Sequence, residues 1–204
     1  MGRRENKVFE LQGVNHLALV CSDMARTVDF YSNVLGMPLI KTLDLPYGSG
    51  QHFFFDIGNG DALAFFWFPD APERAPGVAA PAHLVGRGSL NSAHGSMNHV
   101  AFNVPEEKIE EYREKLEARG VEVTEIFNHD DSPTQVSETL TDDVYVRSLY
   151  FFDPDGILLE FACWTRELAA DEAHHPPATA ADAPRYLEIR ERAIREYQEQ
   201  QKRG

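Results

Sequence analysis

The chain contains one short sequence twice, and this internal repeat constrains the fold more than any other feature. The first copy, residues 15–20, reads Asn-His-Leu-Ala-Leu-Val, and the second, residues 98–104, reads Asn-His-Val-Ala-Phe-Asn-Val. Each copy opens an apolar, strand-like stretch and is followed by a helix-like segment that ends at a glycine, Gly36 or Gly120. Repeats of this kind mark a duplicated supersecondary unit. We therefore expect two equivalent modules that share one core.

The first module is expected over residues 11–68, in the order strand, helix and three strands. Asp23 is a typical helix N-cap, and apolar residues follow it at helical spacing as far as Gly36. The Gly-Asn-Gly turn at 58–60 predicts a hairpin between the last two strands. The expected elements are a strand at 14–20, a helix at 24–35, and strands at 38–43, 52–57 and 61–68.

The second module is expected over residues 97–165 and repeats this order. Pro105 stands at a helix start, where its missing N–H costs nothing. The Asp-Pro-Asp-Gly sequence at 153–156 is a strong turn signal between the last two strands. The expected elements are a strand at 98–104, a helix at 105–119, and strands at 121–127, 144–152 and 157–164.

Two further segments lie outside the modules. Residues 69–96 are rich in Ala, Gly, Ser and Pro, which predicts a connector, and a connector of this length is often functional, for example as a lid. Residues 176–204 combine a Pro/Ala-rich linker with a charged helix at 185–202 whose sparse apolar residues form one stripe. We expect that helix to pack on the body of the protein or on a partner chain.

The repeat also places a histidine, His16 or His99, at the same point of each first strand. Glu160 lies inside an apolar strand, where a carboxylate is costly to bury unless it is paired or metal-bound. Two histidines and one carboxylate form the ligand set of non-haem Fe(II) oxygenases. Ala64, the equivalent of Glu160 in the first module, supplies no fourth ligand, so the predicted metal site is open and catalytic. The alternative is two core histidines and a solvent-facing glutamate.

Other histidines are candidates for acid–base chemistry, because an unperturbed histidine titrates near neutral pH. His129 is favoured, since its loop precedes a strand that is expected to line the site. For each of them the alternative is a solvent-exposed position. The remaining candidates are His52, His83 and His94, whereas His174 and His175 lie beyond the modules and are expected at the surface.

Aromatic side chains alternate along the predicted strands of both modules. One set faces the helices as ordinary core, and the other lines the mouth of the site, where it suits a flat aromatic substrate. The sequence leaves open which set does which. The first set is Phe53, Phe55, Phe65 and Trp67, and the second is Tyr150 and Phe152.

The chain resembles the vicinal oxygen chelate superfamily, which includes glyoxalase I, methylmalonyl-CoA epimerase, fosfomycin-resistance proteins and type I extradiol ring-cleaving dioxygenases. The resemblance covers roughly residues 11–165. It is carried by the doubled strand-helix-three-strand order, the two Asn-His strand starts, and two motifs. These motifs are Asp-Phe-Tyr-Ser-Asn-Val-Leu-Gly at 29–36 and Tyr-Phe-Phe-Asp-Pro-Asp-Gly-Ile-Leu-Leu-Glu at 150–160.

The resemblance implies an α+β fold in which two paired βαβββ modules form a cup-shaped mixed sheet around a metal, with His16, His99 and Glu160 as ligands. It also implies a role for Tyr150, which matches a tyrosine that hydrogen-bonds the ionised substrate oxygen in the extradiol enzymes. Two expected histidines of those enzymes are missing. Thr141 stands at the place of one, and Asp61 falls near the place of the acid–base histidine.

The first hypothesis for function is therefore a non-haem Fe(II) dioxygenase of the extradiol type, which cleaves a catechol-like ring with O2. Its metal is expected to be Fe(II), with Mn(II), Zn(II), Ni(II) and Co(II) as alternatives. The second hypothesis is a glyoxalase-like lyase, isomerase or epimerase that uses the metal as a Lewis acid. The third is a metal-free protein that binds a small molecule.

Composition narrows the choice of partners and compartment. The formal charge of −14 argues against nucleic acid and anionic membranes, which need clustered Lys and Arg. No apolar run is long enough to span a bilayer, and no secretory signal is visible. Cys21 and Cys163 lie in apolar stretches and are expected to be buried, reduced thiols. These features predict a cytoplasmic protein, and we expect a homodimer that acts on a small molecule.

Overall fold

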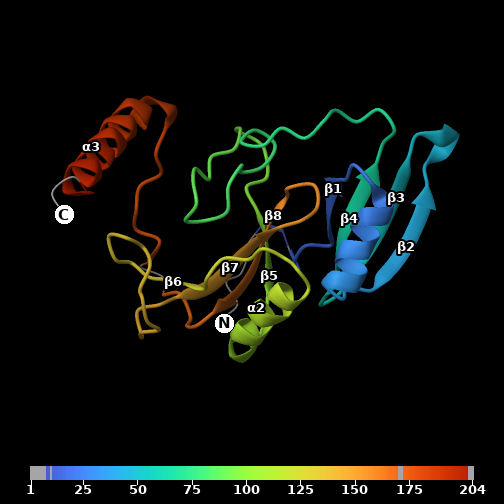
Figure 1. Cartoon of the computed structure of the whole chain (residues 1–204), viewed down its shortest axis with the longest axis horizontal. Coiled ribbons are helices and arrows are strands. Elements are labelled where there is room, and N and C mark those ends of the chain that lie inside the picture. The colour runs from blue at the N-terminus through green and yellow to red at the C-terminus, as the bar shows by residue number, and fades with distance from the viewer. Residues whose placement is uncertain (1–7, 10, 170–171, 202–204) are drawn as a thin grey trace. The chain divides into compact units, whose positions relative to one another are not determined.

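The computed structural model describes residues 8–9, 11–169 and 172–201, and these form two compact units, residues 1–167 and 168–204. The end of the expected 176–204 segment, residues 202–204, therefore lies outside the described residues. The first unit holds both modules and the connector, and the second holds the C-terminal helix (Figure 1).

The first module has the order that the repeat predicts. Asp23 caps the helix, since its carboxylate accepts a hydrogen bond from the backbone N–H of Arg26 at 3.0 Å. The parallel pairing of β1 with β4 and antiparallel pairing elsewhere give a mixed sheet in the order β1-β4-β3-β2. The elements are β1 (His16–Val20), α1 (Met24–Val28) continued by a π-helical segment (Asp29–Val34), β2 (Leu39–Asp44), a 3₁₀ turn (Pro46–Gly48), β3 (Gln51–Gly58) and β4 (Asp61–Trp67).

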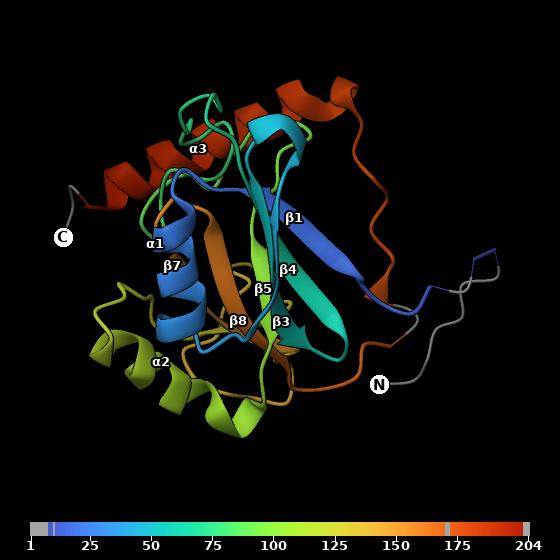
Figure 2. The same cartoon turned by 90° about the vertical axis from the view of Figure 1, so that its right-hand side faces the viewer.

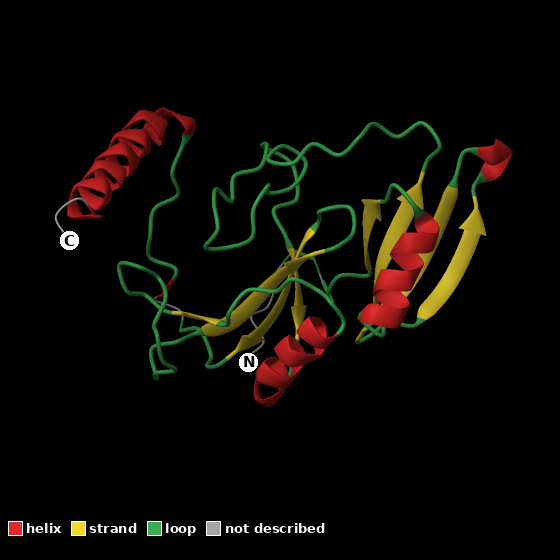
Figure 3. Ribbon diagram, viewed as in Figure 1, coloured by secondary structure: helices red, strands yellow, loops and turns green. Residues whose placement is uncertain are grey.

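The second module repeats the arrangement in a mixed sheet of order β5-β8-β7-β6 (Figure 3). Its elements are β5 (Val100–Asn103), a 3₁₀ turn (Glu106–Lys108), α2 (Ile109–Ala118), β6 (Phe127–His129), β7 (Val146–Phe152) and β8 (Leu158–Trp164). Two four-stranded mixed sheets with their helices confirm the predicted α+β class.

The expected strand at 121–127 is the main correction to the predicted elements. Only residue 127 of that range belongs to β6, and Val123 makes an isolated bridge to Phe151. The reason is local, because the Thr124 hydroxyl oxygen accepts the hydrogen bond of the Tyr150 N–H at 3.0 Å. A side chain thus replaces a backbone acceptor, which interrupts a regular ladder before β6 begins.

The hydrophobic core joins the helices of both modules to one face of each sheet. Tyr31, Ile109 and Leu116 contribute from the helical segments, and they are 0%, 0% and 3% exposed. Figure 2 shows α1 and α2 lying along the strands. Cys21 and Cys163 belong to this core and are free and buried, as expected.

The turn at 153–156 fastens the second module to the first. The Tyr31 hydroxyl donates to the Asp153 carboxylate at 3.1 Å. The Asp155 carboxylate accepts hydrogen bonds from the Ser22 N–H, the Ser22 hydroxyl and the Arg26 guanidinium, at 3.0, 2.5 and 2.7 Å. A single tight turn therefore holds the start and the middle of the first module's helical segment.

The connector has no helix or strand of its own, but part of it is buried. Leu84 is 4% exposed and Pro81 is also buried. Arg74 donates to the Asp155 backbone carbonyl at 3.4 Å, and Asn98 donates to the Leu90 carbonyl at 2.8 Å. The segment is thus tied to the second module near both of its ends.

The second unit contains a 3₁₀ turn (Ala180–Asp182) and α3 (Ala183–Gln201), which begins two residues before the expected helix start. Thr179 and Asp182 form a capping box at its entry. Apolar residues of α3 are exposed where their burial is described, including Tyr186 at 56% and Ile194 at 49%. Among the described residues, no helix has both the length and the apolar character needed to cross a membrane.

Candidate metal centre

The strand register assigns each aromatic set to one face of its sheet. Phe53 pairs with Phe65 across β3 and β4, and Phe55 and Phe65 are fully buried in the shared core. The first aromatic set therefore faces the helices. Tyr150 and Phe152 belong to a separate cluster, on the face of the second sheet that the helices do not cover. We call this second surface the site face, because Glu160 lies opposite Tyr150 in the register.

His99 and Glu160 form a close pair on the site face. His99 directly precedes β5, and Glu160 lies in β8 beside Ala101 of that strand. The His99 Nε2 atom is 2.9 Å from a carboxylate oxygen of Glu160, whose side chain is 7% exposed. The Ser148 hydroxyl donates to the other carboxylate oxygen. Two of the three predicted ligands therefore come together within the chain.

The asparagine that precedes each histidine sets the tautomer of the imidazole. The Asn98 side-chain oxygen lies 2.8 Å from His99 Nδ1, and the Asn15 oxygen lies 2.7 Å from His16 Nδ1. An amide oxygen can only accept a hydrogen bond, so each Nδ1 carries the proton. The Nε2 lone pair of both histidines is then free to bind a cation, which is the usual arrangement around a metal ligand.

The pair fits a divalent metal. A neutral Nε2 and a carboxylate oxygen are both acceptors, so their close approach needs a proton or a cation between them. Two ligand atoms that each lie about 2.1 Å from one ion, about 90° apart, are separated by about 3 Å. The observed 2.9 Å agrees with that separation.

The electrostatics of the pair favour an ionised carboxylate. Burial alone would raise the pKa of Glu160, but when a proton rather than a metal ion lies between His99 and Glu160, hydrogen bonds, chiefly from His99 and then from Ser148, lower the pKa below its ordinary value. Tyr150 has the opposite tendency, because burial and the nearby Glu160 charge raise the pKa of its hydroxyl. The site face thus offers a carboxylate ligand beside a neutral phenol.

Tyr150 links the pair to His129. The Tyr150 hydroxyl lies 3.4 Å from His129 Nε2, and its ring packs edge-on against His99 with the centroids 5.9 Å apart. The His129 ring stacks on Phe127 at 6.1 Å. The structure therefore places both of these predicted catalytic residues beside the predicted ligand pair.

His16 lies apart from the pair, on β1 of the first module. Its ring packs against Phe54 with the centroids 5.6 Å apart. Within the described ranges 8–9, 11–169 and 172–201, no three His, Cys, Asp or Glu residues are grouped so that they could hold a metal ion. One chain, as described, thus holds two of the predicted ligands in one place and the third in another. Asp61 begins β4 in the first module, near Gly13, and Ala64 is fully buried.

The other histidines divide into packed and exposed ones. His52 stacks on Phe66 at 3.7 Å, and its buried Nε2 has no hydrogen-bond partner. Burial and the nearby His16 lower the pKa of His52. His83 and His94 are exposed in the connector, Thr141 is exposed in the loop before β7, and His174 and His175 pack on each other in the second unit.

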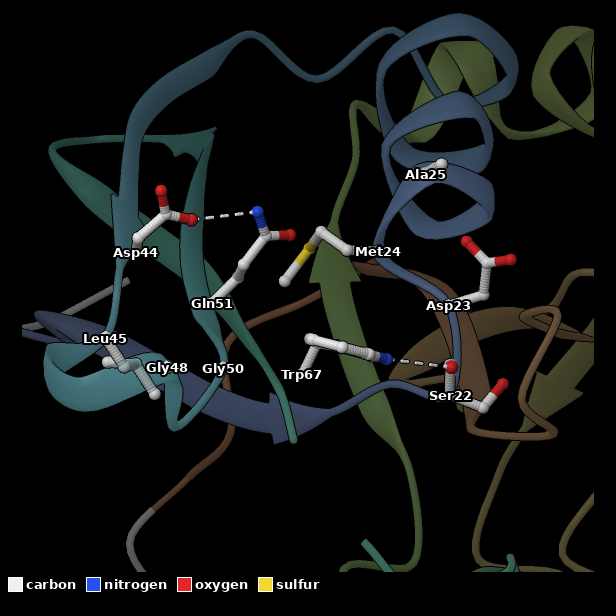
Figure 4. A pocket seen from close by; sticks show the side chains of 10 residues that line it. All are labelled: Ser22, Asp23, Met24, Ala25, Asp44, Leu45, Gly48, Gly50, Gln51 and Trp67. Carbon is white, nitrogen blue, oxygen red and sulfur yellow. Dashed lines mark hydrogen bonds between the residues drawn. The ribbon is translucent and has the colours of Figure 1, made fainter. Parts of the chain in front are cut away.

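A cavity of about 780 Å³ opens elsewhere in the first module, beside the start of α1 (Figure 4). The Trp67 indole N–H donates to the Ser22 carbonyl at 3.2 Å, and the Gln51 amide donates to the Asp44 carboxylate at 3.0 Å. Neither His99 nor Glu160 lines this cavity, so the cavity is separate from the candidate metal centre. The lining residues are Ser22, Asp23, Met24, Ala25, Asp44, Leu45, Gly48, Gly50, Gln51 and Trp67.

Comparison with known proteins identifies the family. Residues 13–161 match the model of the Glyoxalase/Bleomycin resistance protein/Dioxygenase superfamily. The chain belongs to this superfamily. The membership confirms the resemblance found in the sequence and supports a metal-dependent enzyme.

Individual relatives are distant. The chain is 26% identical to the metallothiol transferase FosB of Lysinibacillus sphaericus over 151 residues, which cover 74% of this chain and 82% of that protein. It is 27% identical over 121 residues to the putative ring-cleaving dioxygenase MhqE of Bacillus subtilis, covering 57% of this chain but 35% of that protein. The crystal structure of SMU.1112c aligns with a TM-score of 0.53 and 25% identity, over 75% of this chain and 99% of that one.

Two contributors to the site were missed by the sequence reasoning. Ser148 carried no signal, because a serine within a strand has no distinctive pattern. Asn98 did carry one, since an asparagine precedes the histidine in both copies of the repeat.

Proposed function

We propose that this protein is an enzyme in which a divalent metal ion, held by His99 and Glu160, binds a small substrate through two neighbouring oxygens. The observation that carries the proposal is the 2.9 Å contact between a tautomer-fixed imidazole and a buried carboxylate. Family membership supports metal dependence. The bound metal would act as a Lewis acid that stabilises negative charge on the substrate oxygens.

We further propose that His16 completes the ligand set from a second copy of the chain. His16 has an asparagine partner at Nδ1, as His99 has, and its Nε2 can therefore bind a cation, yet the described part of one chain does not bring it to the pair. In a dimer, the His16 of each copy would meet the His99 and Glu160 of the other. In this proposal the homodimer expected from the sequence is needed to complete the metal ligand set.

The residues around the pair have roles that follow from their contacts. Glu160 accepts a hydrogen bond from the Ser148 hydroxyl on one carboxylate oxygen, which leaves the oxygen beside His99 for a cation. Tyr150 stays protonated and can donate its hydroxyl hydrogen to a substrate oxygen. His129, at 3.4 Å from that hydroxyl, can accept a hydrogen bond from it or hold it in place. Asp61 has no such contact with the pair within one chain.

We place Lewis-acid chemistry of the glyoxalase and thiol-transferase kind ahead of ring cleavage with Fe(II) and O2. FosB matches most of both chains, whereas the match to the putative ring-cleaving relative covers 35% of that protein. The extradiol pattern also lacks two histidines at Thr141 and Asp61. Ring cleavage remains the second candidate, because the two-histidine, one-carboxylate set is the one that non-haem Fe(II) enzymes use.

Metal analysis of purified variants tests the ligand set. His16→Ala, His99→Ala and Glu160→Ala should each lose stoichiometric metal, whereas His94→Ala, which changes an exposed histidine, should keep it. Full metal occupancy in any of the first three variants would remove that residue from the set.

Mixing two inactive variants tests whether the site is shared. A dimer of one His16→Ala chain and one Glu160→Ala chain keeps one complete site if His16 comes from the other copy, and none if all three ligands come from one chain. We expect one metal ion per mixed dimer, measured after purification through two different affinity tags. A mixed dimer without metal would refute the shared site.

Oxygen uptake then separates the two chemistries. With catechol as the substrate, a ring-cleaving enzyme loaded with iron should consume O2 and give a coloured product, and the zinc form should be inert. A Lewis-acid enzyme should show no O2 uptake, and its zinc form should remain active on an α-hydroxycarbonyl or a thiol adduct.

A further inference from the structure

The site face of the second module is divided into a polar half and an apolar half. The polar half holds the His99–Glu160 pair and Ser148. The apolar half is a cluster that the connector enters, with Leu84 packed between strand residues. Its fully or nearly buried members are Leu84 at 4%, Tyr150 at 7% and Leu158 at 0%, with the partly buried Val85, Phe127 and Phe152 packed around them.

Tyr150 stands on the boundary between the two halves. Its ring packs edge-on against His99 and belongs to the same buried cluster as Leu84. Any ligand that is bound at His99 and extends across Tyr150 therefore meets the connector. The connector lies outside both repeated modules, so the wall that it forms is not part of the repeat.

The wall is held in place by several contacts. The Arg87 side chain forms an ion pair with Glu122, and the Arg87 N–H closes a turn on the Leu84 carbonyl at 3.0 Å. Gly86 has a φ of +78°, and a Cβ there would lie 3.4 Å from the Phe127 ring. Because the backbone that follows Leu84 is fixed in this way, the leucine cannot move aside without breaking these contacts.

We propose that Leu84 is a specificity-determining residue, which walls off the apolar half of the site face and limits ligands at His99 to compact ones. This inference rests on the proposed function. The excluded ligands are those with a bulky apolar substituent on the side of Tyr150 that faces the connector. Leu84→Ala should open an apolar hollow between Tyr150, Leu158 and Phe127, into which such a substituent fits.

The test compares two probes, catechol and 4-tert-butylcatechol, in binding titrations with the zinc-loaded protein and again in EDTA. The variants are Leu84→Ala and, as a matched control, Val78→Ala, which truncates a connector residue that is 55% exposed. The measured quantity is the ratio of the two affinities within each protein. We expect Leu84→Ala to shift this ratio at least about tenfold toward the bulky probe, since each newly buried carbon is worth a factor of about four and the burial of two gives a factor of about sixteen.

The outcomes separate this inference from the proposed function. A shift with Leu84→Ala and none with Val78→Ala supports the wall, in zinc or in EDTA. An unchanged ratio in Leu84→Ala, or the absence of binding by both probes to that variant in both conditions, overturns it. The proposed function is judged independently by metal content, because wild-type protein without stoichiometric metal would refute it even if the hollow binds the bulky probe.

Discussion

The contact between Asp155 and the first module yields a prediction whose size can be worked out from the structure. The Asp155 side chain is 10% exposed and accepts three hydrogen bonds, two from Ser22 and one from Arg26. Asp155→Ala removes all three acceptor contacts. It also leaves the N–H and hydroxyl of Ser22 without their partner.

The two Ser22 bonds to a largely buried carboxylate should contribute about 1.5 kcal/mol each. Arg26 is 49% exposed, so its ion pair is screened by solvent and should contribute no more than about 1 kcal/mol. We therefore expect Asp155→Ala to lower the free energy of unfolding by about 3 to 4 kcal/mol. Arg26→Ala, which keeps the Ser22 bonds, should lower it by about 1 kcal/mol or less.

Urea unfolding at pH 7, followed by circular dichroism, measures both changes. The double variant adds a further check, because the part of the Arg26→Ala loss that comes from Asp155 should vanish when Asp155 is already absent, which leaves only the hydrogen bond from Arg26 to the Ser22 hydroxyl at 2.7 Å. The reasoning is refuted if Asp155→Ala costs less than about 1 kcal/mol, or if Arg26→Ala costs as much as Asp155→Ala. Either result would mean that the turn at 153–156 does not fasten the modules together.

Three further predictions concern pH, the site and the backbone. Burial raises the pKa of Asp153 to about 6, so the folded state holds this proton more tightly than the unfolded state. The stabilisation from this proton is complete below about pH 4 and is lost as the pH rises through 6, which lowers the free energy of unfolding by about 3 kcal/mol. Asp153→Asn should remove this pH dependence from the free energy of unfolding, measured by urea titrations between pH 4 and 7. Tyr150→Phe should leave metal content unchanged but weaken catechol binding to the zinc form about tenfold, since a hydrogen bond to a charged oxygen is lost; equal binding would show that the hydroxyl does not contact the ligand. Gly50→Ala should lower the free energy of unfolding by more than about 2 kcal/mol in urea, because the φ of Gly50 is +142° and an added Cβ would lie 1.9 Å from the Trp67 carbonyl oxygen. In the same urea experiment Gly58→Ala, whose added Cβ meets no atom within 4 Å, should cost about 1 kcal/mol.

The sequence predicted the architecture because the repeat carries most of the folding information. Helix ends were marked by residues with a physical reason to be there, such as Asp23 at an N-cap and Gly36 at a φ of +77°. The prediction of a strand at 121–127 was wrong, and the pattern of apolar residues along the chain does not reveal the reason. A threonine hydroxyl at Thr124 replaces a ladder acceptor, and only the folded partner, Tyr150, reveals it.

The sequence offered residues for the candidate site but not their assembly. A carboxylate in an apolar strand pointed to Glu160, and the repeat pointed to His99 and His16; as metal ligands these three stay predictions. Whether equivalent strands meet within one chain or between two chains depends on how the modules dock, and residue patterns within a single module do not encode that. Leu84 was equally invisible, because an isolated leucine in a Pro/Gly-rich segment gives no sign of the surface that it covers.

The two modules share the same order of elements but differ in the residues at the candidate site and in what covers them. The second module has Glu160 and a connector over the apolar part of its site face. The first has Ala64 at the equivalent place and an open face on which His16 and Val20 are exposed, the latter at 50%. In the proposed dimer each module would supply what the other lacks: one would offer a histidine on an uncovered apolar surface, and the other a histidine and a carboxylate, which the proposed ligand set completes with a third ligand. A second copy would satisfy both needs at once, because covering the open face buries apolar area at the same place where it delivers His16 to the pair. Metal binding and dimer formation should therefore strengthen each other, so metal removal is expected to weaken the dimer, and a dimer equally stable with and without metal in sedimentation measurements would break this link.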